Sequence, residues 1–241
     1  MLPAGGGAAV FAGPDSPTNK WIGAGFDGPV KESELAEVEA AFAKQGARLQ
    51  AEVSTLADPG FHAMLASRGY VSSGFENVLG HPVLSGVGPS VAGISVELAK
   101  PSELSSFADV LVEAFANPDI GGVGGDALPP REEIRRWVLV TLEMPGFRGY
   151  LARIGNEIAG AGSLRVDSGV AQFSGAGTLP QLRRRGVQTA LLRARLQAAA
   201  SEACDVGVIV TQPGSKSQQN SQREGFALLY ARQLWVKTPP Q

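Results

Sequence analysis

The chain has 241 residues, of which 44% are hydrophobic and 18% are charged, and its formal net charge at pH 7 is −2. This composition is typical of a soluble globular protein, and the near-neutral charge argues against nucleic-acid binding, which needs a basic face. The single cysteine, Cys204, excludes a disulfide within the chain and favours a reducing compartment. We expect a buried structural thiol there. The length is large for one domain and comfortable for two small ones.

Neither a secretory signal nor a membrane span is expected. The Gly- and Ala-rich stretch at 1–10 has no basic residue before its apolar part. No apolar run reaches the roughly 18 residues that a membrane helix needs. We therefore expect a cytoplasmic protein that works away from membranes.

The first half alternates short strands and helices. Ser33 is expected to cap a helix that ends at Gly46, and Asp58 with Pro59 opens a second helix that runs to Arg68. Strands are expected at 8–12, 21–26, 48–55 and 71–79.

The second half contains more elements than the first. A glycine-rich connection at 117–130 separates its first two helices. Strands are expected at 94–99, 149–154, 158–166, 170–179, 206–211 and 226–237. Helices are expected from Ser102, at 131–143, after Gly186, and at 215–224.

The stretch at 175–192 predicts an anion-binding site. A strand ends at Pro180, the arginines Arg183 to Arg185 and Gly186 follow, and a helical pattern then begins. The free N–H groups and the positive dipole end of that helix both favour an anion. Pyrophosphate is the usual occupant of such a site.

The run from Arg183 to Gln188 resembles the pyrophosphate loop of the GNAT superfamily of acyl-CoA N-acyltransferases. The family pattern is Gln or Arg, two residues, Gly, one residue, then Gly or Ala. Arg183 and Gly186 fit this pattern, whereas Gln188 departs from its last position. The side chain of Gln188 is tolerable if it points away from the main-chain donors of the loop.

The resemblance implies an α/β (α+β) GNAT fold, a mixed central sheet flanked by helices, over residues 94–241. The first half echoes the layout of the second, since Gly23 to Phe26 resembles Gly175 to Thr178 and Gly69-Tyr70 resembles Gly225-Phe226. We therefore interpret residues 1–90 as a truncated, degenerate GNAT-like half-domain; an unrelated small α/β domain is the alternative. Its Asp27-Gly28-Pro29 turn is unsuited to pyrophosphate.

By resemblance, the strand at Thr178 and Leu179 pairs with the pantetheine arm, and an N–H near Thr178 polarises the thioester carbonyl. An ordinary edge strand is the alternative. The residues expected to bind acetyl-CoA are Thr178, Leu179, Arg183, Arg184, Arg185, Gly186, Val187, Gln188, Thr189, Ser217 and Asn220. Some of these arginine and serine side chains have solvation or helix capping as an alternative role.

The acid and base are less well defined. Many family members place Asn and Tyr on the helix before Gly225, where this sequence has Gly214 and Ser221. Ser221 is the expected catalytic partner of Thr178, although serine is a poorer proton donor than tyrosine. Candidates for a base are Asp167, Glu157, Glu113 and Asp126; the other titratable groups considered are His62, His81, expected at the surface, and Tyr230. No cluster has metal-ligand spacing, so we expect no metal.

The expected function is N-acetyl transfer from acetyl-CoA to a primary amine by direct attack. A GNAT-like module that binds acyl-CoA without turnover is the alternative, because the family tyrosine and a strand carboxylate are missing. The acceptor stays open, and a homodimer is a possible assembly.

Overall fold

The computed structural model of the chain describes residues 1–13, 16, 18–83, 87–118 and 130–237. The chain divides into a first unit, Met1–Val78 with Leu229–Gln241, and a second unit, Leu79–Leu228. The predicted domain limits, 1–90 and 94–241, give the whole last strand to the second domain. In the structure, the last strand, Ala227–Lys237, and the strand Tyr70–Pro82 each contribute residues to both units.

The first unit is a small sheet with two helices. Its strands follow the order β1-β2-β3-β4-β11-β5, in which β3 and β4 are parallel and β4 and β11 antiparallel. The helices are α1 (Glu32–Lys44) and α2 (Pro59–Ser67). The strands are β1 (Leu2–Ala4), β2 (Gly7–Val10), β3 (Lys20–Ile22), β4 (Gln50–Ser54), β5 (Tyr70–Pro82) and β11 (Ala227–Lys237).

The core of this unit lies between one sheet face and both helices. Trp21 is buried and its ring meets Phe61 of α2 edge-on, with the ring centroids 5.0 Å apart. Asp58 caps α2 as predicted and accepts a hydrogen bond from the Gly60 N–H. The predicted cap of α1 was wrong: Lys31 is the N-cap, and Ser33 lies within the helix.

Glycine conformation explains where the predicted strand at 21–26 falls short. The strand ends at Ile22 because Gly23 and Gly25 have φ values of +75° and +85°, which a β-strand does not accommodate. The Gly23–Phe26 segment is therefore a turn, whereas Gly175–Thr178 belongs to a strand. The sequence echo between these segments does not extend to their secondary structure.

The second unit has the predicted element order, β-α-α-β-β-β-α-β-α-β, and the predicted GNAT-type mixed sheet flanked by helices. Its strands follow the order β5-β10-β9-β8-β7-β6. The new strands are β6 (Ile94–Leu98), β7 (Phe147–Ile154), β8 (Glu157–Asp167), β9 (Val170–Thr178) and β10 (Val206–Thr211). The helices are α3 (Leu104–Ala116), α4 (Arg131–Leu142), α5 (Val187–Ser201) and α6 (Lys216–Arg223).

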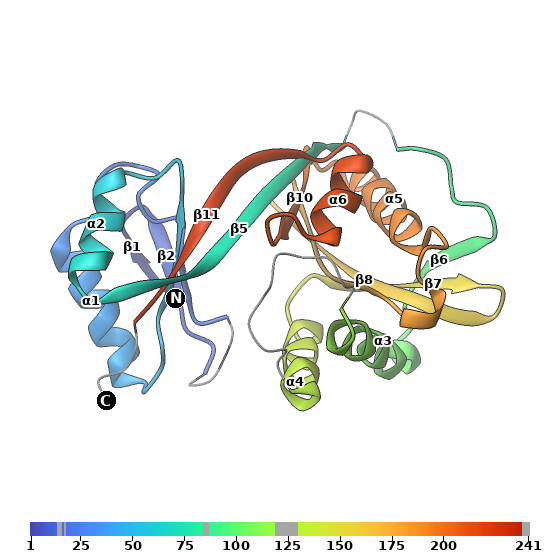
Figure 1. Ribbon diagram of the computed structural model, residues 1–241, viewed down its shortest axis with the longest axis horizontal. Helices are drawn as coiled ribbons and strands as arrows, with labels where there is room; N and C mark the ends of the chain where they lie inside the picture. The colour runs from blue at the N-terminus through green and yellow to red at the C-terminus, as the bar shows by residue number, and fades with distance from the viewer. Residues whose placement is uncertain (14–15, 17, 84–86, 119–129, 238–241) are drawn as a thin grey trace. The chain divides into compact units, whose positions relative to one another are not determined.

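Helices cover both faces of this sheet (Figure 1). On one face, Gly177 of β9 allows α3 to approach the sheet closely, because a Cβ at this position would lie 2.4 Å from the Ala114 Cβ. On the other face, a Cβ at Gly160 would lie 2.6 Å from Val187 of α5. Helices α3 and α5 therefore pack against opposite faces of the sheet at β8 and β9. No helix in the described ranges is long and apolar enough to cross a membrane.

Candidate active site

The site is organised by two parallel strands that separate. In the described chain, β9 and β10 are paired from Val170↔Val206 to Phe173↔Ile209 only. β9 nevertheless continues to Thr178 and β10 to Thr211. We call the opening between residues 174–178 of β9 and 210–211 of β10 the fork. On its other edge, β9 stays paired with β8 as far as Gly160↔Thr178.

A β-bulge bends β9 where the fork begins. Ser163 pairs with Ser174 and Ala161 with Gly177, so one residue of β8 faces two residues of β9. Gly175, within the bulge, has a φ of +47°, a value that favours glycine. Because a bulge bends its strand and increases the local twist, it turns the end of β9 away from β10.

A buried arginine supports this bulge from the α5 side. Arg195 is fully buried; its Nε donates to the Leu191 carbonyl at 3.0 Å and its Nη1 to the Ser163 carbonyl at 2.9 Å. Burial lowers its pKa to about 10, so the guanidinium is still charged at neutral pH. Arg195 thereby links α5 to the strand residue at which the register shifts.

The backbone of Thr178 faces the fork. The Leu179 N–H donates to the Ala159 carbonyl at 3.0 Å, so these two residues form a hydrogen-bonded pair of the antiparallel ladder. In such a ladder the next residue turns its N–H and C=O to the opposite edge, which here is the open edge of β9. The Thr178 N–H therefore points toward the fork, which is compatible with the prediction that it polarises the thioester carbonyl. The Leu179 N–H, by contrast, is already used by the sheet.

The loop after β9 presents free main-chain donors at the start of α5. A short 3-10 turn, Pro180–Leu182, leads into Arg184 and Gly186, whose φ values are +61° and +86°. The first α5 hydrogen bond runs from the Ala190 N–H to the Gly186 carbonyl. The N–H groups of Val187, Gln188 and Thr189 precede that bond and have no acceptor in the described chain. The sequence predicts an anion site at these N–H groups, which a helix N-terminus favours.

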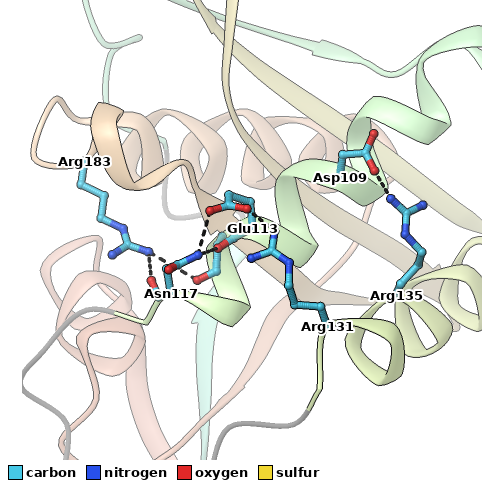
Figure 2. Close-up of polar contacts among 7 residues, drawn as sticks. Asp109, Glu113, Asn117, Arg131, Arg135 and Arg183 are labelled. Carbon is cyan, nitrogen blue, oxygen red and sulfur yellow. Dashed lines mark hydrogen bonds and ion pairs between the residues drawn. The ribbon is translucent and has the colours of Figure 1, made fainter.

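The three arginines of the loop point to different surroundings. Arg184 and Arg185 are exposed. Arg183 instead reaches the C-terminal end of α3, where its Nη2 donates to the Ala114 carbonyl at 3.3 Å and to the Asn117 carbonyl (Figure 2). It therefore satisfies helix-end carbonyls that would otherwise lack a donor. We therefore predict that Arg183 takes part in CoA binding through its backbone.

Gln188, the residue that departs from the family pattern, has a defined partner. Its Nε2 donates to the Thr178 Oγ1 at 2.8 Å, which joins the first turn of α5 to the end of β9. The side chain thus folds back along the sheet, and Thr178 is buried beneath it.

The predicted residues of α6 are engaged within the helix itself. Ser221 is buried and its Oγ donates to the Ser217 carbonyl at 2.9 Å. The Asn220 Oδ1 accepts from Arg223 at 2.9 Å, and Ser215 caps the helix by accepting from the Gln218 N–H. To protonate a thiolate, Ser221 would have to exchange its bond to the Ser217 carbonyl.

A polar cavity of about 560 Å³ lies between α3 and α4 and is bordered by Leu179 at the end of β9. Two ion pairs cross it: Glu113 with Arg131, and Asp109 with Arg135 (Figure 2). The members of each helix are one turn apart, so carboxylates of α3 face guanidinium groups of α4. Glu113, a predicted base candidate, lies here and also accepts from the Asn117 Nδ2 at 2.8 Å.

Two further base candidates lie at hairpin turns, and one is not placed. Asp167 pairs with Val170, at the opposite end of β9 from Thr178. Glu157 is exposed and is the first residue of β8, directly after the turn from β7. Asp126 lies outside the described residues. In the described chain, no three His, Cys, Asp or Glu side chains gather in a way that could hold a metal ion.

The remaining titratable groups considered from the sequence are in apolar or distant surroundings. His81 was expected at the surface, but it is buried against Phe226, with ring centroids 5.2 Å apart. His62 and Tyr230 belong to the first unit, where His62 accepts from the Trp235 indole at 3.2 Å. Cys204 is a free, buried thiol as predicted, and burial raises its pKa.

The end of β9 and the free N–H groups at the start of α5 lie side by side, and these are the two places where the family resemblance predicts that acyl-CoA binds. Residues 116–226 match the model of the acetyltransferase (GNAT) family. The second unit therefore contains a GNAT acetyltransferase domain. Members of this family generally use acyl-CoA as a substrate.

Solved structures share the fold over nearly the whole chain. A GCN5-related N-acetyltransferase from Kribbella flavida has a TM-score of 0.68 and 18% identity, over 92% of this chain and 81% of that one. A GCN5-related N-acetyltransferase from Sphaerobacter thermophilus has a TM-score of 0.60 and 14% identity, over 86% of this chain and 65% of that one. A tandem GNAT protein from the clavulanic acid biosynthesis pathway has a TM-score of 0.58 and 16% identity, over 87% and 70%. No curated protein sequence matches the chain.

Proposed function

We propose that the protein transfers the acetyl group of acetyl-CoA to a primary amine by direct attack. The fork beside the open N-terminus of α5 is the observation that carries this proposal. The loop donors would bind the pyrophosphate, and the arm of the substrate would run along the open edge of β9. Its thioester carbonyl would then accept a hydrogen bond from the Thr178 N–H.

In the proposed reaction, the neutral amine nitrogen attacks the thioester carbonyl carbon, and a C–N bond forms. The Thr178 N–H stabilises the oxyanion of the tetrahedral intermediate. The C–S bond then breaks, and the thiolate takes up the proton that the amine loses. An amine that is already partly neutral can lose its proton through water, without a dedicated side-chain base.

The polar cavity between α3 and α4 is the proposed entrance for the amine. It adjoins Leu179, the residue after Thr178, and is lined by the carboxylates Asp109, Glu113 and Glu132 and by Arg131 and Arg135. The excess of carboxylates favours a cationic acceptor over an anionic one.

We keep the domain assignment as part of the proposal: residues 94–241 as the catalytic GNAT domain, and residues 1–90 as a degenerate GNAT-like half. The overlap of 87% of this chain with a tandem GNAT structure supports a two-half arrangement. A cytoplasmic location is also part of the proposal, because a chain with a single cysteine is typical of a reducing compartment.

Titration calorimetry with acetyl-CoA tests the first step. We expect binding below 1 mM, on the order of the KM values usual for enzymes, and its absence would contradict the proposal. Release of free thiol in the presence of a panel of amines tests the second step.

A non-catalytic acyl-CoA-binding module is the second candidate, favoured by the bond between Ser221 and the Ser217 carbonyl. It predicts CoA binding without thiol release for any amine. If the protein is catalytic, we expect Ser221→Ala to lower kcat less than about threefold, because the Ser221 hydroxyl already donates to the Ser217 carbonyl. A fall of more than about tenfold would instead identify Ser221 as the acid.

A further inference from the structure

Thr211 has a buried hydroxyl group without a hydrogen-bond partner. Among the described residues, three buried side-chain atoms lack one: His81 Nδ1, Arg195 Nη2 and Thr211 Oγ1. Arg195 makes two other hydrogen bonds, whereas the hydroxyl is the whole polar part of the Thr211 side chain. The residue is 5% exposed. A buried hydroxyl left unpaired destabilises a folded protein, so its presence calls for an explanation.

The side chain of Thr211 faces the α5 side of the sheet. Side chains alternate along a strand, so Gly207, Ile209 and Thr211 share one face of β10. A Cβ at Gly207 would lie 2.6 Å from the Phe173 ring and 3.3 Å from Leu196 of α5. Ile209 packs in the same apolar cluster as Leu196.

Thr211 also lies at the fork. The last pair of the two parallel strands is Phe173↔Ile209, so Thr211 comes two residues after pairing has stopped. Its N-terminal neighbours on the same face, Gly207 and Ile209, are held against β9, and Thr211 is the first residue of that face with an open edge beside it.

Across the fork, Thr178 faces the same side. Gly160, its direct partner on β8, points at Val187 and Leu191 of α5, and residues directly opposite in a ladder share a face. The Thr178 hydroxyl is occupied by Gln188. Of the two threonine hydroxyls that border the fork on the α5 side, only that of Thr211 has no hydrogen-bond partner within the described chain.

We propose that the Thr211 hydroxyl binds the amide-containing arm of the acyl-CoA that enters the fork. This inference rests on the proposed function. The arm carries neutral amide groups, and a threonine hydroxyl can donate to an amide carbonyl or accept from an amide N–H. A neutral, buried hydroxyl suits such a group better than a phosphate, which the loop donors and exposed arginines at the start of α5 are placed to bind.

The inference predicts opposite effects on stability and on binding. Thr211→Val replaces the hydroxyl with a methyl group of similar shape, so the free protein no longer buries an unpaired polar group. We expect its melting temperature to rise by about 2–4 °C. We expect its Kd for CoA to rise by about three- to tenfold, because one hydrogen bond to the arm is lost.

The experiment measures melting temperature without ligand, together with calorimetric Kd values for CoA and for phosphoadenosine diphosphate, the half of CoA without the arm. Thr211→Val should weaken the binding of CoA and leave the binding of phosphoadenosine diphosphate unchanged. Thr211→Ser, which keeps the hydroxyl, should bind CoA within about twofold of the unchanged protein. An unchanged CoA Kd in Thr211→Val, or an equal loss for both ligands, overturns the inference. Absence of CoA binding by the unchanged protein overturns the proposed function as well, which separates the two failures.

Discussion

The Gln188 side-chain amide donates a 2.8 Å hydrogen bond to the Thr178 hydroxyl, so the start of the predicted phosphate helix is joined to the predicted carbonyl-polarising residue. Gln188 occupies the position where the family pattern has Gly or Ala. From that position its side chain holds the end of β9 against the first turn of α5 through the hydrogen bond to Thr178.

Charge at position 188 should separate stability from binding. Gln188→Glu places a carboxylate in the first turn of α5, where the helix dipole stabilises it by about 0.3–1 kcal/mol. The same charge repels pyrophosphate, so we expect the CoA Kd to rise at least about tenfold at low salt and less at high salt. Melting curves and calorimetry at two salt concentrations check both effects.

Gln188→Ala is the matched control, since it restores a small residue of the family pattern and adds no charge. It should bind CoA within about twofold of the unchanged protein. Equal CoA affinity of the Glu variant and the unchanged protein would show that phosphate does not bind at this helix.

Gly186 and Gly28 provide a matched pair for locating the CoA site. Both have positive φ, +86° and +119°, so valine at either position should cost about 1–2 kcal/mol of backbone strain. A Cβ at Gly186 would also lie 3.1 Å from the Val91 Cγ1, whereas at Gly28 no atom lies within 4 Å. We expect Gly186→Val to abolish CoA binding and Gly28→Val to change stability alone.

The stoichiometry of the same titrations tests the assignment of the first half. If residues 1–90 are a degenerate copy, the unchanged protein binds about one CoA per chain, because the turn at Asp27 has an acidic side chain and Pro29 lacks an N–H. Two equivalent sites per chain, or CoA binding that survives Gly186→Val, would refute this assignment.

Arg183 and Arg184 should have separable roles despite being adjacent. Arg183→Met removes the donor from the Ala114 and Asn117 carbonyls, so the free energy of unfolding should fall by about 1–2 kcal/mol, with the CoA Kd changed less than about twofold. Arg184 is exposed. Its replacement by Met should leave stability within about 0.5 kcal/mol and raise the CoA Kd at low salt. The reverse pattern would place the Arg183 side chain on the phosphate.

Glu34 should make the first unit sensitive to acid. Its carboxylate accepts from the Lys31 and Gly5 N–H groups, both at 2.9 Å. These bonds, that to Lys31 first, lower the Glu34 pKa below its ordinary value of 4.5. A lowered carboxyl pKa stabilises the folded state above the unfolded-state pKa, and this contribution is lost as the pH falls through the folded-state pKa.

Glu34→Gln should therefore cost about 1 kcal/mol at pH 7, as the loss of a helix-capping interaction does. The difference from the unchanged protein should disappear as the pH drops below 4.5, the ordinary value for this group. Denaturant unfolding across that range measures it. A difference that persists at the lowest pH would mean that packing of the side chain, and not its charge, is responsible.

Short-range features were predictable from the sequence alone. Helical periodicity, the Asp58-Pro59 start and the turns at Gly155 and Gly169 each act over a few residues, so the element order of the second unit followed from them. The strand, loop and helix around Gly186 are consecutive in the chain, which made the order of these three elements predictable.

Only the tertiary structure decided how side chains from distant segments are used. Arg183 reaches Asn117, the residue after α3, which lies 66 residues earlier in the chain. The partner of the Ser221 hydroxyl depends on how that side chain is oriented within α6. The fork arises from a bulge between β8 and β9 and from the end of pairing with β10, neither of which leaves a local pattern. The same holds for Thr211: its sequence neighbours predict a strand, but the absence of a partner for its hydroxyl appears only when β10, α5 and the end of β9 are packed together.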